Sequence, residues 1–129
     1  MNNLNQLTIQ EALKGLKEKK FSAVKLTKAC LEQIKKCDKK INAFFTVCEE
    51  EALKLAKEID NHPQGRPLEG IPIALKDLYL TKGIKTTAAS KILAEFIPPF
   101  DATVVQKLKN SGAIIIGKLN ADEWCYGAC

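Results

Sequence analysis

Hydrophobic residues recur at helical spacing through the first half of the chain, and polar caps divide them into separate helices. Thr8 and Glu11 have the spacing of a capping box, so a first helix is expected to begin after Thr8 and to end near Lys19. Ser22 is expected to cap a longer helix that runs to about Cys37. The apolar face of this second helix, opposite its lysines, consists of Val24, Thr27, Leu31 and Ile34.

A third helix is predicted after a turn at residues 38–42. It is expected to span residues 49–60, where three successive glutamates suit the positive end of a helix dipole. Its apolar stripe consists of Ala52, Leu55, Ala56 and Ile59. Together the three helices predict a helical layer over about residues 1–61.

The apolar runs of the second half are short and have the length of buried strands. One covers residues 71–75, and the other covers residues 113–116. Between them we expect one or two helical turns at residues 91–96 and a helix that Asp101 caps and Gly112 closes. Strand, helix, strand is the order of a parallel unit. The chain is therefore assigned to the α/β class, with N-terminal helices followed by the first strands of a mixed sheet.

The first of these strands ends on Lys76. A strand that is apolar at nearly every position expects cover on both faces, so this lysine is expected to be at least partly buried. Burial disfavours the ammonium form and lowers the pKa, and a lysine with a lowered pKa can accept a proton. The alternative is that Lys76 extends its charged end into water along an apolar surface. Lys76 is the candidate catalytic residue.

The net charge of +5 is concentrated in the first forty residues, whose ten lysines and four acids give +6. Such a surface can attract nucleic-acid phosphates or an acidic partner. Nineteen of the twenty basic residues are lysine, however, whereas sites that read bases favour arginine. We therefore interpret this surface as a solvated, lysine-rich face.

Several kinds of site and location are not expected. No apolar run approaches the roughly 20 residues of a membrane span, and the N-terminus lacks the regions of a secretory signal, so a cytoplasmic location without membrane contact is expected. The five cysteines include no Cys-x-x-Cys pair, which argues against a metal site. Residues 112–118 match the G-x-x-x-x-G-K spacing of a phosphate-binding loop, but Leu119 stands where a hydroxyl would bind magnesium. No cofactor is expected in this chain.

Longer motifs resemble those of one enzyme family. They run from about Thr8 to the end of the chain and comprise residues 39–44, 67–77, 82–93, 98–105 and 112–123. This ordered set resembles the amidase signature family and, within it, the branch formed by the A subunits of glutamyl-tRNA(Gln) and aspartyl-tRNA(Asn) amidotransferases. Such a set is far more specific than any one short motif.

The resemblance implies a Ser–cis-Ser–Lys triad in which Lys76 is the base. The full-length protein would hydrolyse glutamine, and a partner subunit would use the ammonia to amidate mischarged Glu-tRNA(Gln) or Asp-tRNA(Asn), a ligase reaction. The B and C subunits of the amidotransferase are then the expected partners, and ATP and Mg²⁺ are expected in the partner subunit. A stand-alone amidase of the same family is the alternative. In this chain alone, Lys76 is expected to stay solvated and protonated.

Relative to the family, the chain lacks both catalytic serines. Family members are several times longer and carry them in Gly/Ser-rich segments, whereas Ser22, Ser90 and Ser111 lie in no such segment. The sequence is interpreted as the N-terminal part of a single amidase domain, residues 1–129, whose sheet core starts at about residue 62. Alone it is expected to be inactive. If the chain ends naturally at Cys129, a non-catalytic interaction module is the alternative.

Two segments are expected near Lys76. The resemblance places residues 86–90 beside the active site as a supporting loop, although a Ser/Thr-rich stretch is otherwise an ordinary turn. Ala128 and Cys129 depart from the Gly-Ser-Ser that the family has in its glutamine pocket, which leaves the substrate preference open. Trp124 and Tyr126 are interpreted as ordinary packing near a strand exit rather than as a stacking platform.

Overall fold

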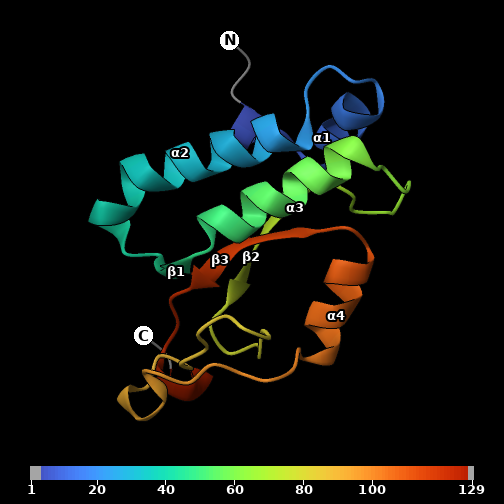
Figure 1. Ribbon diagram of the computed structural model, residues 1–129. Coiled ribbons are helices and arrows are strands. Elements are labelled where there is room, and N and C mark those ends of the chain that lie inside the picture. The colour runs from blue at the N-terminus through green and yellow to red at the C-terminus, as the bar shows by residue number, and fades with distance from the viewer. Residues whose placement is uncertain (1–3, 128–129) are drawn as a thin grey trace.

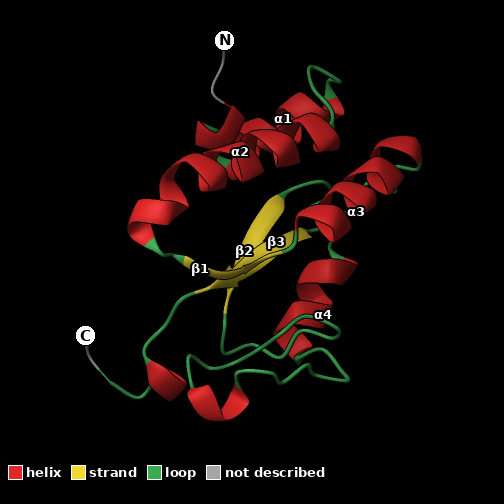
Figure 2. Ribbon diagram, turned by 60° about the vertical axis from the view of Figure 1, so that its left-hand side comes forward, coloured by secondary structure: helices red, strands yellow, loops and turns green. Residues whose placement is uncertain are grey.

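The computed structural model describes residues 4–127, which fold into helices on both faces of a small sheet (Figures 1 and 2). The α-helices are α1 (Ile9–Lys17), α2 (Ala23–Ile41), α3 (Glu49–Asn61) and α4 (Thr103–Asn110). The strands are β1 (Phe44–Val47), β2 (Pro72–Lys76) and β3 (Ile114–Leu119), and the short 3-10 helices are η1 (Leu4–Gln6), η2 (Lys91–Leu93) and η3 (Glu123–Cys125). The α/β class predicted from the sequence is confirmed.

The first two helices begin where the sequence predicts. The Thr8 side chain accepts a hydrogen bond from the Glu11 amide, and the Glu11 carboxylate accepts one from the Thr8 amide at 2.8 Å. The Ser22 side chain caps α2 by accepting from the Lys25 amide at 3.1 Å. The predicted turn at residues 38–42 is wrong, because α2 continues to Ile41 and ends only at Asn42, which takes the left-handed conformation of a C-cap.

The three strands form a mixed sheet in the order β1-β3-β2, with β2 parallel and β1 antiparallel to β3. The parallel pair, with α4 in the connection, is the unit that the sequence predicts. β1 is not predicted, because its four residues are half-buried or exposed and give no continuous apolar run. Among the described residues, β2 is an edge strand of the sheet, and most of its side chains are half-buried. Within the same residues, burial on both faces along nearly the whole strand is found only for β3.

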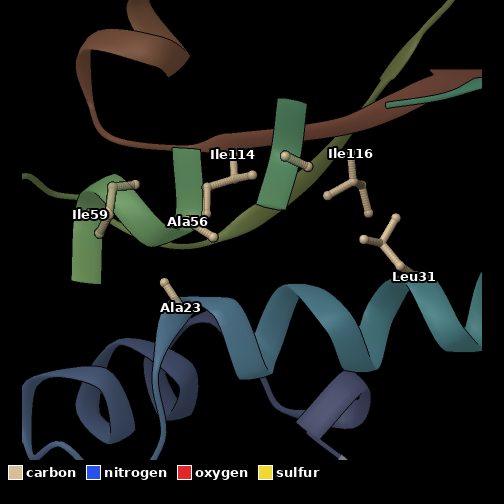
Figure 3. Close-up of a cluster of buried hydrophobic side chains, with 7 residues drawn as sticks. Ala23, Leu31, Ala56, Ile59, Ile114 and Ile116 are labelled. Carbon is tan, nitrogen blue, oxygen red and sulfur yellow. The ribbon is translucent and has the colours of Figure 1, made fainter. Parts of the chain in front are cut away.

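The core has two layers that meet at β3. On one face, Ile114 and Ile116 pack against α2 and α3, as the side chains in Figure 3 show. On the other face, Ile115 packs with Leu75 and with Val105 of α4. Because successive side chains of a strand point to opposite faces, the run of three isoleucines supplies both layers. The predicted stripes of α2 and α3 are confirmed as the faces turned to this core.

The segment before α4 differs from its prediction. Ala102, not Asp101, is the N-cap residue of α4, and no side chain caps this helix. The Asp101 carboxylate instead accepts hydrogen bonds from the Lys82 amide at 2.7 Å and from the Lys109 ammonium at 2.9 Å. It therefore ties the start of α4 to its last turn and to the loop after β2. Among the described residues, no helix has the length and apolar content to cross a membrane.

Candidate functional site

Lys76 is the last residue of β2 and lies where the chain leaves the sheet. Its side chain is 43% exposed, and its ammonium lies 3.6 Å from a carboxylate oxygen of Asp122. Asp122 immediately precedes η3, so the end of β2 and the C-terminal segment meet at this pair. The candidate catalytic residue is thus partly exposed and lies beside a carboxylate.

The surroundings of Lys76 favour its charged form. The neighbouring Cys125 sulfur is the main influence that raises the pKa of Lys76, burial opposes it, and the Asp122 carboxylate adds to the rise, so that the pKa is raised on balance. The pKa of Asp122 is lowered, first by a hydrogen bond from the Gly127 amide at 2.8 Å and then by Lys76. Lys76 is therefore an ammonium at neutral pH, which is the state that the sequence analysis expects for this chain.

Asp77, the next residue, points into the protein. Its carboxylate lies 3.2 Å from the ammonium of Lys118, and both side chains are essentially unexposed. Lys118 also donates hydrogen bonds to the Tyr79 carbonyl at 3.0 Å and to Thr86 Oγ1 at 2.7 Å. Burial lowers the pKa of Lys118, and Asp77 opposes this effect. A complete set of partners thus satisfies the buried ammonium.

Lys118 belongs to this site but is not predicted from the sequence. The predicted strand stops at residue 116, and Lys118 is considered there only as the lysine of the G-x-x-x-x-G-K spacing, whereas β3 runs from Ile114 to Leu119. The signal that was available is a lysine inside a run of buried strand positions, because such a position requires a buried counter-charge.

The loop at residues 86–90 joins Asp77 to the C-terminal segment, and Figure 1 shows the two regions together below the sheet. The Thr87 amide and hydroxyl both donate to Asp77 Oδ2, the amide at 2.9 Å. The Trp124 amide donates to the Ala88 carbonyl at 2.8 Å, and the Ser90 hydroxyl donates to the Glu123 carboxylate at 2.7 Å. The structure therefore places this loop next to Lys76 and Asp77.

Backbone strain is concentrated in the same place. Ala88 and Ala89 have φ angles of +50° and +57°, and Trp124 and Cys125 have φ angles of +56° and +53°. Residues with a Cβ pay a steric cost in this left-handed region, and such residues cluster at functional sites. The two strained pairs are joined directly by the hydrogen bond from the Trp124 amide to the Ala88 carbonyl.

The aromatic residues of the C-terminal segment are not packed as expected. Trp124 is 47% exposed and Tyr126 is 94% exposed, so the interpretation of both as ordinary packing is wrong. The chain turns back toward Asp122 here and leaves these rings at the surface. Ala128 and Cys129, which were expected to influence the substrate pocket, lie outside the described residues.

A second surface feature lies away from Lys76. A groove of about 800 Å³ is lined by residues of η1, α1 and α2. The lysines among its lining residues are Lys14, Lys20, Lys25, Lys28 and Lys36. The lysine-rich face expected from the sequence thus borders this groove. Across residues 4–127, no group of three or more His, Cys, Asp or Glu side chains is arranged to hold a metal ion.

Known proteins resemble this chain over nearly all of its length. A family model described as Amidase matches residues 25–129. The A subunit of glutamyl-tRNA(Gln) amidotransferase from Geobacter metallireducens is 51% identical over 128 residues, which cover 97% of this chain and 26% of that protein. The chain therefore spans about a quarter of the length of this relative.

Two solved structures share the fold. The A subunit of glutamyl-tRNA(Gln) amidotransferase from Thermotoga maritima matches with a TM-score of 0.74 and 37% identity, over 95% of this chain and 25% of its own. The native peptide amidase of Stenotrophomonas maltophilia matches with a TM-score of 0.85 and 29% identity, over 92% of this chain and 26% of its own. The same backbone arrangement thus occurs in a peptide amidase and in a subunit of a glutamyl-tRNA(Gln) amidotransferase.

Proposed function

Since this chain belongs to the amidase family, we propose that it is the N-terminal part of a single amidase domain and that Lys76 is the proton acceptor in amide hydrolysis. The helical layer would extend to about residue 61, and the sheet core would begin at about residue 62. The observation that carries the proposal is the position of Lys76. It lies at the end of β2, at the meeting point of three segments, with its ammonium facing Asp122.

The proposed chemistry needs groups that this chain does not supply. In a Ser–cis-Ser–Lys arrangement, one serine attacks the carboxamide carbon, and Lys76 receives the serine proton through the second serine. The proton then goes to the departing nitrogen, which leaves as ammonia. Lys76 must be neutral to accept a proton, whereas its surroundings here raise its pKa. Enclosure by further segments, which removes water, would shift the pKa in the required direction.

We propose glutamine as the substrate and a tRNA-dependent amidotransferase as the assembly. The ammonia would then pass to the subunits that amidate mischarged Glu-tRNA(Gln) or Asp-tRNA(Asn), with ATP and Mg²⁺ bound outside this chain, in the cytoplasm. The support is the identity of 51% to the A subunit of a glutamyl-tRNA(Gln) amidotransferase and, among the solved structures, an identity of 37% to such a subunit against 29% to a peptide amidase. The B and C subunits would be the partners.

A stand-alone amidase is the second candidate, and the TM-score of 0.85 to a peptide amidase favours it. The two candidates differ in substrate, because a stand-alone enzyme would act on another small amide. A non-catalytic interaction module is the third possibility, and it predicts no role for Lys76 in any hydrolysis.

A hybrid enzyme tests the proposed substrate. This chain would replace the segment that it matches in the A subunit from Geobacter metallireducens, which would be produced with its partner subunits. We expect the hybrid to release ammonia from glutamine, and we expect the 129-residue chain alone to release none. Preferential hydrolysis of a C-terminally amidated peptide would support the second candidate instead. Release of ammonia by the chain alone would contradict the need for serines supplied from elsewhere.

A further inference from the structure

The ion pair between Asp77 and Lys118 is enclosed far more completely than the candidate catalytic lysine beside it. The two side chains are 1% and 0% exposed, and their charged atoms lie 3.2 Å apart. Asp77 Oδ1 accepts no well-aligned hydrogen bond from the described residues, so the charge of Lys118 is its compensation. Lys118 completes its own set of partners with the Tyr79 carbonyl and the Thr86 hydroxyl.

Asp77 uses the rest of its polar groups to hold other segments in place. Its amide donates to the Leu119 carbonyl at 2.9 Å, which fixes the end of β2 against β3. Its carbonyl accepts from the Ala88 amide at 2.9 Å, and its second carboxylate oxygen accepts from the amide and hydroxyl of Thr87. One buried residue therefore anchors both the strand end and the loop.

The anchored loop in turn holds the segment that faces Lys76. The Ala88 carbonyl accepts from the Trp124 amide, and the Ser90 hydroxyl donates to Glu123. This segment carries Asp122, whose carboxylate lies 3.6 Å from the Lys76 ammonium. A continuous series of contacts thus runs from Lys118 through Asp77 and the loop to the immediate neighbours of Lys76.

Buried ion pairs rarely add stability, because the desolvation of two charges offsets their attraction. What such a pair does provide is a single geometry, since any other arrangement leaves a charge buried without a partner. We propose that Asp77 and Lys118 are positioning residues, which hold the loop at residues 86–90 and the segment at residues 122–125 around Lys76.

The inference rests on the proposed function, because it names the residues that position the lysine to which that function assigns proton transfer. Its test measures geometry and ionisation at Lys76 rather than turnover. A Lys76 that proves to have no part in hydrolysis would refute the proposed function and leave the positioning result standing.

The test uses nuclear magnetic resonance on the 129-residue chain with labelled lysine side chains. Lys118→Met and Asp77→Asn each remove one charge of the pair. We expect the Lys76 pKa to fall toward the ordinary lysine value of about 10.4, because Asp122 and Cys125 are no longer held beside it. We also expect the Thr87 amide to exchange at least tenfold faster with solvent, whereas resonances of the α2–α3 core keep their positions.

Two further variants keep the outcome decisive. Lys109→Met removes a lysine whose ion-pair partner, Asp101 at 2.9 Å, lies outside the loop, so it should leave the Lys76 titration unchanged. Thr87→Val keeps the ion pair and removes a hydroxyl that donates to Asp77 and accepts from the Ala89 amide at 3.1 Å, so it loosens the loop and should reproduce a smaller shift even if the charge variants unfold. The proposal would be overturned if Lys118→Met folds and the pKa of Lys76 is unchanged in it. If both charge variants unfold, an unchanged pKa of Lys76 in Thr87→Val would overturn the proposal instead.

Discussion

Lys76 and Asp77 are consecutive in the chain, yet their side chains lie in opposite environments, 43% exposed and 1% exposed respectively. The alternation of a strand continues past the last residue of β2 and produces this contrast. One side chain is left free to face further parts of an active site, and the other is fixed in the protein interior. The end of β2 therefore carries a candidate base and its structural anchor side by side.

The first prediction concerns the stability of the buried pair. Lys118→Met should lower the free energy of unfolding by about 3–5 kcal/mol, because it leaves the Asp77 carboxylate buried without a counter-charge. Adding Asp77→Asn should recover about 1–3 kcal/mol of that loss, since the remaining amide is neutral and still accepts from Thr87. Urea denaturation of the two single variants and the double variant measures this coupling. Strictly additive losses would contradict a direct interaction.

The second prediction concerns acid stability at Asp101. Burial of this carboxylate opposes its ionisation, but the bonds from Lys109 and from the Lys82 amide prevail and hold the pKa below its usual value. Because the pKa of Asp101 in the folded state lies below the unfolded value of about 3.9, the ionised carboxylate stabilises the folded protein. This stabilisation is complete above a pH of about 3.9 and is lost as the pH falls through the folded pKa. Asp101→Asn should therefore cost about 1–3 kcal/mol at pH 7 and much less at pH 2.

Urea denaturation at the two pH values checks the Asp101 prediction. Glu32→Gln, at an exposed position in the middle of α2, is the matched control and should change stability by less than about 0.5 kcal/mol. An equal cost of Asp101→Asn at both pH values would show that the charge of Asp101 contributes nothing.

The third prediction separates two glycines that have similar backbone conformations. Gly112 and Gly65 have φ angles of +89° and +73°, but a Cβ at Gly112 would lie 2.7 Å from the Glu69 Cα, whereas a Cβ at Gly65 meets open space. Gly65→Ala should cost about 1–2 kcal/mol from the left-handed conformation alone. Gly112→Ala should cost about 2–4 kcal/mol, because the close approach is added. Equal midpoints of urea denaturation would contradict the close approach.

The fold follows from the sequence to the extent that hydrophobic periodicity determines it. The α2 and α3 stripes and the parallel pair around α4 are predicted because their apolar spacing is regular. β1 is not predicted, because it depends on the antiparallel pairing of Phe44 with Leu119, a tertiary contact that no local pattern contains. The last turn of α2 is also not predicted, although its end is local, since Asn42 takes the left-handed conformation and its amide bonds to the Asp38 carbonyl.

The candidate site divides in a similar way. Lys76 can be selected from the sequence because an apolar strand ends on it. The pairing of Lys118 with Asp77 cannot, because it joins residues that are 41 positions apart through the parallel register of β2 and β3. The exposure of Tyr126 likewise depends on the turn that brings the Gly127 amide back to Asp122. The residue types of this segment do not indicate that turn.

Replacement of Lys76 in the hybrid amidotransferase tests the central claim most directly. Lys76→Met should reduce ammonia release from glutamine by about 10²–10⁴-fold, the usual contribution of a positioned general base. The matched control Lys91→Met, at an exposed lysine in η2, should keep the activity of the unmodified hybrid. An active hybrid that loses no ammonia release with Lys76→Met would contradict the assignment of Lys76 as the proton acceptor.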